Sequence, residues 1–75
     1  GHLLIYYNQD KPGMLAAVGG ILAGASINIA GVSLGRFAQG EQALTIMSID
    51  SPVPQNVMNQ IAGIDGVLGV KMVTL

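Results

Sequence analysis

A small group of polar side chains, Asn8, Asp10 and Lys11, stands where an apolar run ends, directly before Pro12. Proline fits the first position of a helix, and the residue before a proline disfavours the α conformation. The sequence therefore predicts a helix that starts near Pro12 with Lys11 at its N-cap. The open N–H groups and the dipole of a helix start favour a small anion such as a carboxylate. Because Asp10 could accept hydrogen bonds from an ammonium group, both charged halves of an amino acid have a partner here.

A second interpretation of these residues is purely structural. Asparagine and aspartate are common in turns because their side chains hydrogen-bond to the nearby backbone. On this interpretation Asn8 and Asp10 only shape the connection from strand to helix. The pattern N-x-D-x-P-G leaves a ligand site and a simple turn both open.

The chain is small and poor in charge. Its 75 residues make one small domain, with no cysteine for a disulfide or thiolate metal site and too few histidines for a zinc site. It is 51% hydrophobic and only 9% charged, whereas about 25% charged residues are usual in soluble domains. We therefore expect another copy of the chain, or another domain, to cover part of its surface.

Several functional classes are disfavoured. A net charge of −1 argues against nucleic-acid binding, which needs a basic surface. No apolar run is long enough to span a membrane and no signal peptide is visible, so we expect no membrane partner and a cytoplasmic location. No nucleophile–base pair or metal-ligand cluster can be assembled, around His2 or elsewhere, and the carboxylates stand in separate turns. We therefore expect a domain with no catalytic residue, no metal and no cofactor of its own.

Hydrophobic periodicity predicts the order strand, helix, strand, strand, helix, strand. Strands are expected at residues 3–7, 27–34, 43–49 and 67–75, and helices from Pro12 to Gly24 and from Pro54 to Gly63. The first strand has no alternation, which is typical of a central strand covered on both faces. The first helix would bury a stripe made of Leu15, Val18, Leu22 and Ala25, with Met14 and Ile21 beside it.

Finer expectations concern glycines and strand faces. Gly24 would cap the first helix, and Gly19–Gly20 would lie at a close contact, for which the same helix of a partner copy is one candidate. A hairpin turn is expected at residues 36–42, with Gly40 at positive φ. In the third strand, Ala43, Thr45, Met47 and Ile49 alternate with Leu44, Ile46 and Ser48.

Right-handed crossovers would place the two helices on one face of a four-stranded antiparallel sheet. This is the α+β ferredoxin-like βαββαβ sandwich, a fold with many functions. An RNA-binding example would need aromatic residues on the third strand, which has none, and a metal carrier would need cysteine. A binding module with a polar pocket at its first turn remains.

Two motifs together resemble a known family. Asn8–Leu15 (NQDKPGML) and Ile27–Ala30 (INIA) are similar to the D-R-P-G-hydrophobic-L and G-V-N-I-A elements of ACT domains, the small-molecule sensors of amino-acid metabolism. Residues 40–44, 50–54 and 64–67 also resemble the regulatory ACT domains of D-3-phosphoglycerate dehydrogenases, which are NAD-dependent enzymes of serine biosynthesis. Lys11 stands where arginine is common. The resemblance covers nearly the whole chain, so residues 1–75 are identified as a single ACT-like domain.

The resemblance implies a mechanism. Two ACT domains would pair side by side through their second strands, and an effector, L-serine in these dehydrogenases, would bind across the interface. Ligand binding would then shift the domain arrangement and allosterically control the catalytic domains of the parent enzyme, which would carry the NAD. The ligand-binding residues implied by the family are Asn8, Asp10, Gly13, Met14 and Leu15 of one copy, with Asn28 and Ile29 of the other.

Two alternatives remain open at the level of sequence. Bacterial L-serine dehydratases carry a very similar ACT domain, so the parent could be either enzyme. The domain could also be a purely structural dimerisation module that has kept the fold and lost its ligand. The joint presence of Asp10 and Asn28 favours a sensor, because dimerisation alone needs neither.

Overall fold

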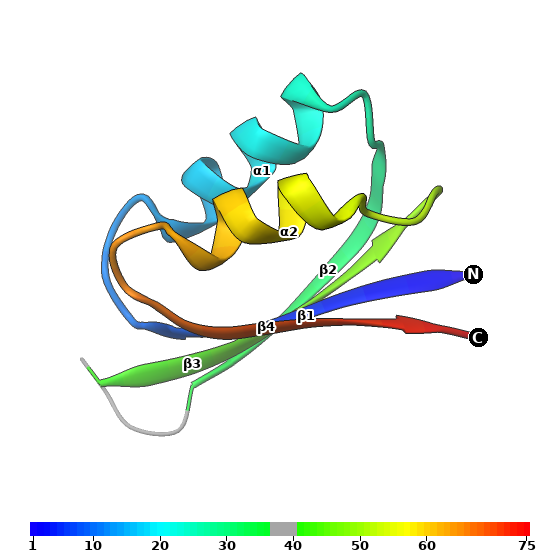
Figure 1. Cartoon of the computed structure of the whole chain (residues 1–75). Helices are drawn as coiled ribbons and strands as arrows, with labels where there is room; N and C mark the ends of the chain where they lie inside the picture. Colours follow the sequence, from blue (N-terminus) through cyan, green and yellow to red (C-terminus); the bar gives the residue numbers. More distant parts are fainter. Residues whose placement is uncertain (37–40) are drawn as a thin grey trace.

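The structure, a computed structural model, describes residues 1–36 and 41–75. In these residues the elements are β1 (His2–Gln9), α1 (Met14–Gly24), β2 (Ile29–Arg36), β3 (Gln42–Ile49), α2 (Gln55–Ala62) and β4 (Val67–Thr74). The strands form an antiparallel sheet in the order β2-β3-β1-β4, and α1 and α2 lie together on one of its faces (Figure 1). The predicted ferredoxin-like α+β sandwich is confirmed.

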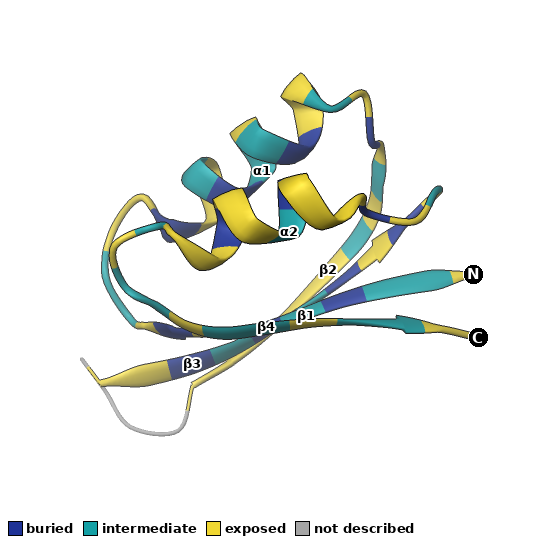
Figure 2. Cartoon of the chain, in the orientation of Figure 1, coloured by how far each residue is buried: buried dark blue, intermediate teal, exposed yellow. Residues whose placement is uncertain are grey.

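The hydrophobic core lies between the helices and the sheet, where Figure 2 shows the buried residues of both layers. Alternation decides which strand residues enter it: of the two alternating sets predicted for β3, the one made of Ala43, Thr45, Met47 and Ile49 is buried. The predicted second helix is also confirmed, since Val57 and Ile61 of α2 are buried and Gly63 is its C-cap. The buried cluster consists of Leu4, Tyr6, Val18, Leu22, Ile27, Met47, Ile49, Val53, Val57 and Ile61.

The expectation that the first strand is covered on both faces is wrong for this chain. β1 is central in the sheet, but its burial alternates: Leu4, Tyr6 and Asn8 are buried, whereas Tyr7 between them is exposed. The physical reason is that α1 and α2 lie on the same face, so that the described residues provide no second layer for the other face.

The first helix begins later than predicted. Its N-cap is Gly13, with a φ of 88° in the left-handed region that glycine adopts without strain, so Lys11 is not the cap and Pro12 belongs to the preceding turn. At the other end Gly24 is still helical. The C-cap is Ala25, and Ser26, at φ 61°, takes the left-handed position expected for a glycine.

The buried stripe of α1 also differs from the prediction. Met14, Val18 and Leu22 are buried at intervals of one helical turn, whereas Leu15 is 51% exposed. The later helix start makes Met14 the first residue of the buried face, and Leu15 faces the space between α1 and β2. No described atom lies near the positions that side chains at Gly19 and Gly20 would occupy, so a close contact is absent within this chain's described residues, and a contact with the same helix of a partner copy stays a prediction.

β2 forms one edge of the sheet and starts two residues later than predicted. It runs from Ile29 to Arg36 instead of 27–34, and in the described part of the chain its pairing partner is β3. Val32 and Leu34 are exposed on this edge strand. β2 and β3 pair antiparallel, but residues 37–40 of the predicted hairpin turn, including Gly40 with its expected positive φ, lie outside the described residues.

The chain ends lie side by side, since the N–H of Leu75 donates to the carbonyl of Gly1 at 2.8 Å. They emerge at the end of the sheet opposite the β1–α1 turn (Figure 1). Among the helices of the described residues, none has the length and apolar character needed to cross a membrane.

Candidate functional site

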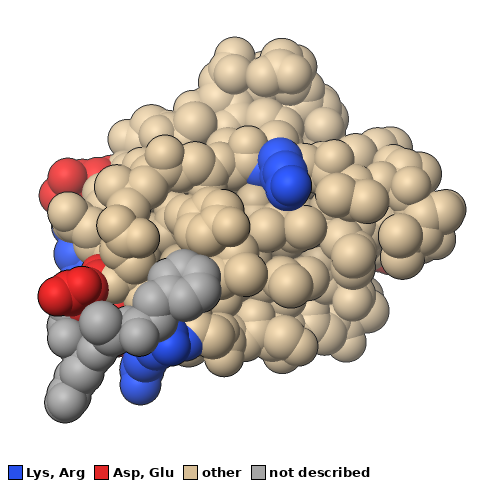
Figure 3. Space-filling view, turned by 90° about the horizontal axis from the view of Figure 1, so that it is seen from below, with Lys and Arg blue, Asp and Glu red and all other residues tan. Residues whose placement is uncertain are grey.

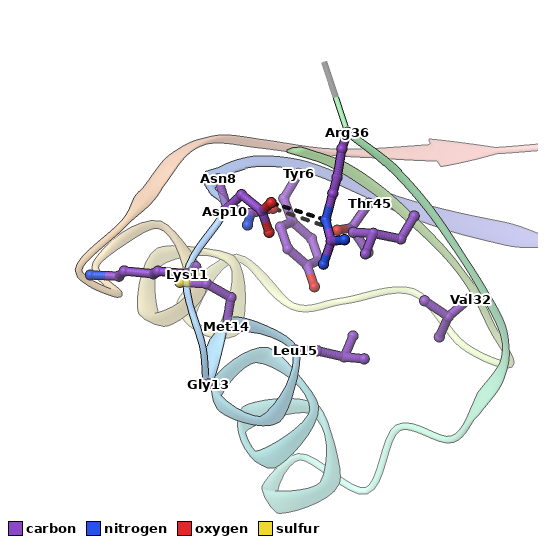
Figure 4. Close-up of a pocket in the computed structure, with 11 residues that line it drawn as sticks. Tyr6, Asn8, Asp10, Lys11, Gly13, Met14, Leu15, Val32, Arg36 and Thr45 are labelled. Carbon is purple, nitrogen blue, oxygen red and sulfur yellow. Dashed lines mark hydrogen bonds and ion pairs between the residues drawn. The ribbon is translucent and has the colours of Figure 1, made fainter. Parts of the chain in front are cut away.

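A cavity of about 160 Å³ opens at the β1–α1 turn, between α1 and the edge strand β2 (Figure 4). Its lining combines charged groups, buried polar groups and apolar side chains from five segments of the chain. The lining residues are Tyr6, Asn8, Asp10, Lys11, Gly13, Met14, Leu15, Val32, Leu34, Arg36 and Thr45.

Backbone hydrogen bonds fix the turn that forms one wall of the cavity. The N–H of Asp10 donates to the carbonyl of Glu41 at 2.7 Å, and the N–H of Gln9 donates to the carbonyl of Gly66 at the same distance. Gly66 has a φ of 104°, and a Cβ there would lie 2.7 Å from Cε of Lys11. The positive φ favours glycine at this position, and the Lys11 side chain that lies over it pairs through Nζ with Asp65 at 3.0 Å.

The side chain of Asp10 is engaged in an ion pair that the sequence did not indicate. Nε of Arg36 donates to Oδ2 of Asp10 at 2.9 Å, with the two side chains 63% and 20% exposed. The carboxylate, predicted to accept hydrogen bonds from an ammonium group, is thus paired with a guanidinium within the chain. Arg36 is the chain's single arginine, but the sequence gives no sign that the end of β2 lies across from the end of β1.

Asn8 is more deeply placed than a turn residue. It is 3% exposed, its Nδ2 donates to the carbonyl of Gln9 at 2.9 Å, and its Oδ1 lies 3.5 Å from the hydroxyl of Thr45. Thr45 stands on β3 next to Asn8 and is also buried. Asn8 and Thr45 therefore form a polar floor whose hydrogen bonds are largely made within the chain.

Tyr6 is a lining residue that sequence reasoning missed. Its hydroxyl lies buried at the cavity, and no described atom forms a hydrogen bond with it. Burial raises the pKa of this hydroxyl above its ordinary value of 10.0, and the neighbouring Thr45 side chain offsets part of the rise. In sequence Tyr6 looked like one more residue of an apolar strand.

The start of α1 supplies a further element of the site. The helix has no side-chain hydrogen bond at its N-cap and no acidic residue in its first turn. Its first N–H groups therefore remain available to an anion, which the helix dipole also favours. Gly13, Met14 and Leu15, all predicted ligand residues, line the cavity at this point.

Two other predicted ligand residues lie away from this cavity in the same chain. Asn28 is exposed at the opposite end of β2, where its N–H donates to Oδ1 of Asp50 at 3.1 Å and its carbonyl accepts from the N–H of Asp50 at 3.2 Å. Ile29 follows it at the start of the strand. Their contribution from a second copy of the chain stays a prediction.

The cavity contains charged groups of both signs. Residues 1–36 and 41–75 contain no group of three or more His, Asp or Glu side chains placed to hold a metal. The cavity offers the Asp10 carboxylate, the Arg36 guanidinium and a helix start, while Lys11, also in the lining, pairs with Asp65. This combination can neutralise an ammonium and a carboxylate at the same time.

The sequence model of the ACT domain family matches residues 2–66. The chain is 31% identical over its full length to a D-3-phosphoglycerate dehydrogenase of Bacillus subtilis and 32% identical to one of Archaeoglobus fulgidus. It spans only 14% and 15% of the lengths of these two relatives.

Solved structures share the fold. The ACT domain from GTP pyrophosphokinase of Chlorobium tepidum superposes with a TM-score of 0.73 at 19% identity, covering 96% of this chain and 95% of that one. At this identity the likeness concerns the fold alone.

Proposed function

The chain belongs to the ACT domain family. On that premise we propose that it is a regulatory domain that binds a small amino acid, with L-serine as the preferred ligand. Binding would allosterically control an enzyme of serine metabolism. The parent that we propose is a phosphoglycerate dehydrogenase, because the relatives named above carry that name. The domain itself would contribute regulation and not chemistry, and NAD would belong to the parent's catalytic domains.

The observation that carries this proposal is the pairing of opposite charges at the cavity. Asp10 would receive the ammonium group of the ligand, while Arg36 and the first N–H groups of α1 would receive its carboxylate. An amino acid brings one charge of each sign, so it can replace the Asp10–Arg36 contact without leaving either side chain unpaired. A ligand with a single charge would leave one of them without a partner.

The edge strand β2 supports a homodimer around the same site. Val32 and Leu34 are exposed on β2, and one edge of β2 faces no other strand of the described sheet. Such an edge offers backbone N–H and C=O groups to another chain and is an aggregation hazard unless a further strand covers it. Antiparallel pairing of two β2 strands about a two-fold axis between Val32 and Ser33 would bring the partner's Ile29 opposite Arg36. The partner's Asn28 would then stand beside the cavity and complete it.

Calorimetric titration of the chain with each of the twenty amino acids tests the sensor proposal. We expect serine to bind most tightly, with one ligand per site at the dimer interface. Absence of a binding heat for all twenty would overturn it. Rates of the full-length parent with and without serine then test the regulatory part, because a sensor must change those rates.

A structural dimerisation module is the second candidate. In its favour, Asp10 is already paired with Arg36, and Asn8 already bonds Gln9 and Thr45. On this alternative the chain dimerises and binds no amino acid, so sedimentation and calorimetry together separate the two functions.

A further inference from the structure

The Tyr6 hydroxyl differs from the other polar groups of the cavity in the described residues. Asp10 is paired with Arg36, and Asn8 and Thr45 contact one another. The side chain of Tyr6 is only 1% exposed, yet its oxygen forms no hydrogen bond with any described atom. A buried hydroxyl without a partner destabilises the folded state, so such a group calls for an explanation.

The direction of the side chain suggests what that partner is. Figure 4 shows the Tyr6 ring crossing the floor of the cavity, with its hydroxyl pointing into the space between the Asp10–Arg36 pair and Leu15. Leu15, Val32 and Leu34, each about half exposed, also line the cavity and offer no side-chain hydrogen bond. The cavity therefore combines a charged pair with apolar side chains and one unsatisfied hydroxyl.

We propose that the Tyr6 hydroxyl is the specificity-determining group of this pocket, exchanging a hydrogen bond with the side-chain hydroxyl of the bound amino acid. This inference rests on the proposed function. With its ammonium and carboxylate at the Asp10–Arg36 end, the amino acid directs its side chain toward Tyr6. Serine supplies the missing partner, whereas alanine leaves the hydroxyl unsatisfied.

Cavity size adds a second restriction. A volume of about 160 Å³ lies below the roughly 300–1,000 Å³ of pockets for drug-sized ligands. The site therefore accepts a short side chain and selects within that set by hydrogen bonding. A neutral hydrogen bond corresponds to about a tenfold difference in affinity at the upper end of its usual range.

Calorimetry with serine, alanine and α-aminobutyrate tests the assignment. The last of these replaces the serine hydroxyl with a methyl group. We expect the unmodified chain to prefer serine over both analogues by about tenfold. Tyr6→Phe should lower serine affinity by about the same factor and leave alanine affinity unchanged. Tyr7→Phe, which removes a hydroxyl from the opposite face of β1, serves as the matched control and should change neither.

Thermal unfolding without ligand separates recognition from structural support. Because Tyr6→Phe removes an unsatisfied buried hydroxyl, the ligand-free variant should melt no lower than the unmodified chain. A variant that melts lower and loses affinity for serine and alanine equally would overturn the inference in favour of a structural role.

The remaining outcomes are also decisive. If Tyr6→Phe keeps its preference for serine, the specificity assignment is wrong while the sensor proposal stands. If the unmodified chain binds serine and α-aminobutyrate equally, the assignment is wrong even should the variant fail to fold. If the unmodified chain binds no amino acid, both proposals are wrong.

Discussion

Nε of Arg36 lies 2.9 Å from Oδ2 of Asp10, so the last residue of β2 holds the turn that leads into α1. This contact joins the edge strand, which we propose as the dimer interface, to the segment that we propose as the ligand site. A ligand that binds Asp10 or Arg36 would weaken the ion pair between them. Figure 3 shows most of the charged groups of this face at one end of the molecule, with a further basic side chain near its middle and an otherwise largely uncharged surface.

Asp10→Ala tests the ammonium partner. Loss of a charge-assisted hydrogen bond should weaken serine binding by about 1.5–3 kcal/mol, which is an order of magnitude or more. The free energy of unfolding should fall by less, about 1 kcal/mol at most, because the Arg36 partner is largely exposed. Calorimetry and thermal melting of one variant measure the two quantities. Glu41→Ala, which removes an exposed carboxylate that does not line the cavity, is the control. Unchanged serine affinity in Asp10→Ala would refute this site assignment.

Arg36→Gln tests the carboxylate partner. We expect serine affinity to fall by about tenfold, because one charge-assisted hydrogen bond to the ligand carboxylate is lost. Serinamide, which has no carboxylate, should bind the variant at least as well as it binds the unmodified chain, since Arg36 no longer competes for Asp10. Lys71→Gln removes a positive charge from β4, outside this cavity's lining, and controls for net charge. Serine affinity that rises in Arg36→Gln would mean that the guanidinium only blocks the site.

Val32→Lys tests the proposed dimer. A lysine in the middle of β2 places a charge on each of two facing strands, and charged edge residues oppose strand pairing. Sedimentation at micromolar concentration should show a dimer for the unmodified chain and a shift toward monomer for the variant. Leu68→Lys puts the same charge on β4, the opposite edge strand, and should leave the dimer intact. A purely monomeric unmodified chain would defeat the dimer proposal.

Asn28→Ala tests the contribution of the second copy. The hydrogen bonds of Asn28 with Asp50 use its backbone N–H and carbonyl, so the substitution should leave the fold of each copy intact. Serine affinity should nevertheless fall, because a hydrogen bond across the interface is lost. Calorimetry, with sedimentation as a check that the dimer persists, measures this effect. Full affinity in a dimeric Asn28→Ala variant would place the site within a single copy.

The raised pKa of Tyr6 predicts a specific loss of stability at high pH. Burial favours the neutral phenol in the folded state, so the unfolded chain releases this proton first, near its ordinary pKa of 10.0. The contribution is fully present below about pH 10 and is lost as the pH rises through the folded pKa. Melting temperatures between about pH 9 and pH 11 should fall more steeply for the unmodified chain than for Tyr6→Phe. Parallel curves would show that Tyr6 ionises equally in both states.

Sequence patterns predicted the order of helices and strands because buried residues recur every two residues in a strand and about every 3.6 residues in a helix. Alternation in β3 and the helical spacing of Val57 and Ile61 depend only on which residues face the helix–sheet core. The helix start was misplaced because two rules compete at this turn. Pro12 fits a first helical position, but the left-handed conformation of Gly13 delays the helix.

The candidate site was predictable only where its residues are neighbours in sequence. Asp10, Gly13 and Leu15 are close in sequence, at the β1–α1 turn and the start of α1 that follows it, and a local motif is enough to predict them. Arg36 and Tyr6 were not found, since their roles depend on the distance between two strand ends and on a missing hydrogen bond. Neither property is encoded by local residue type.

The adjacent chain ends have an architectural consequence. The backbone of Gly1 is hydrogen-bonded to that of Leu75, so a polypeptide can enter and leave this domain at almost one point. Such a unit can be spliced into a surface loop of an unrelated protein without stretching either flanking segment. The pocket, at the far end of the sheet, would then face away from the splice point. The geometry therefore suits a domain that can be inserted into different proteins. The named relatives and the solved neighbour come from enzymes of different kinds.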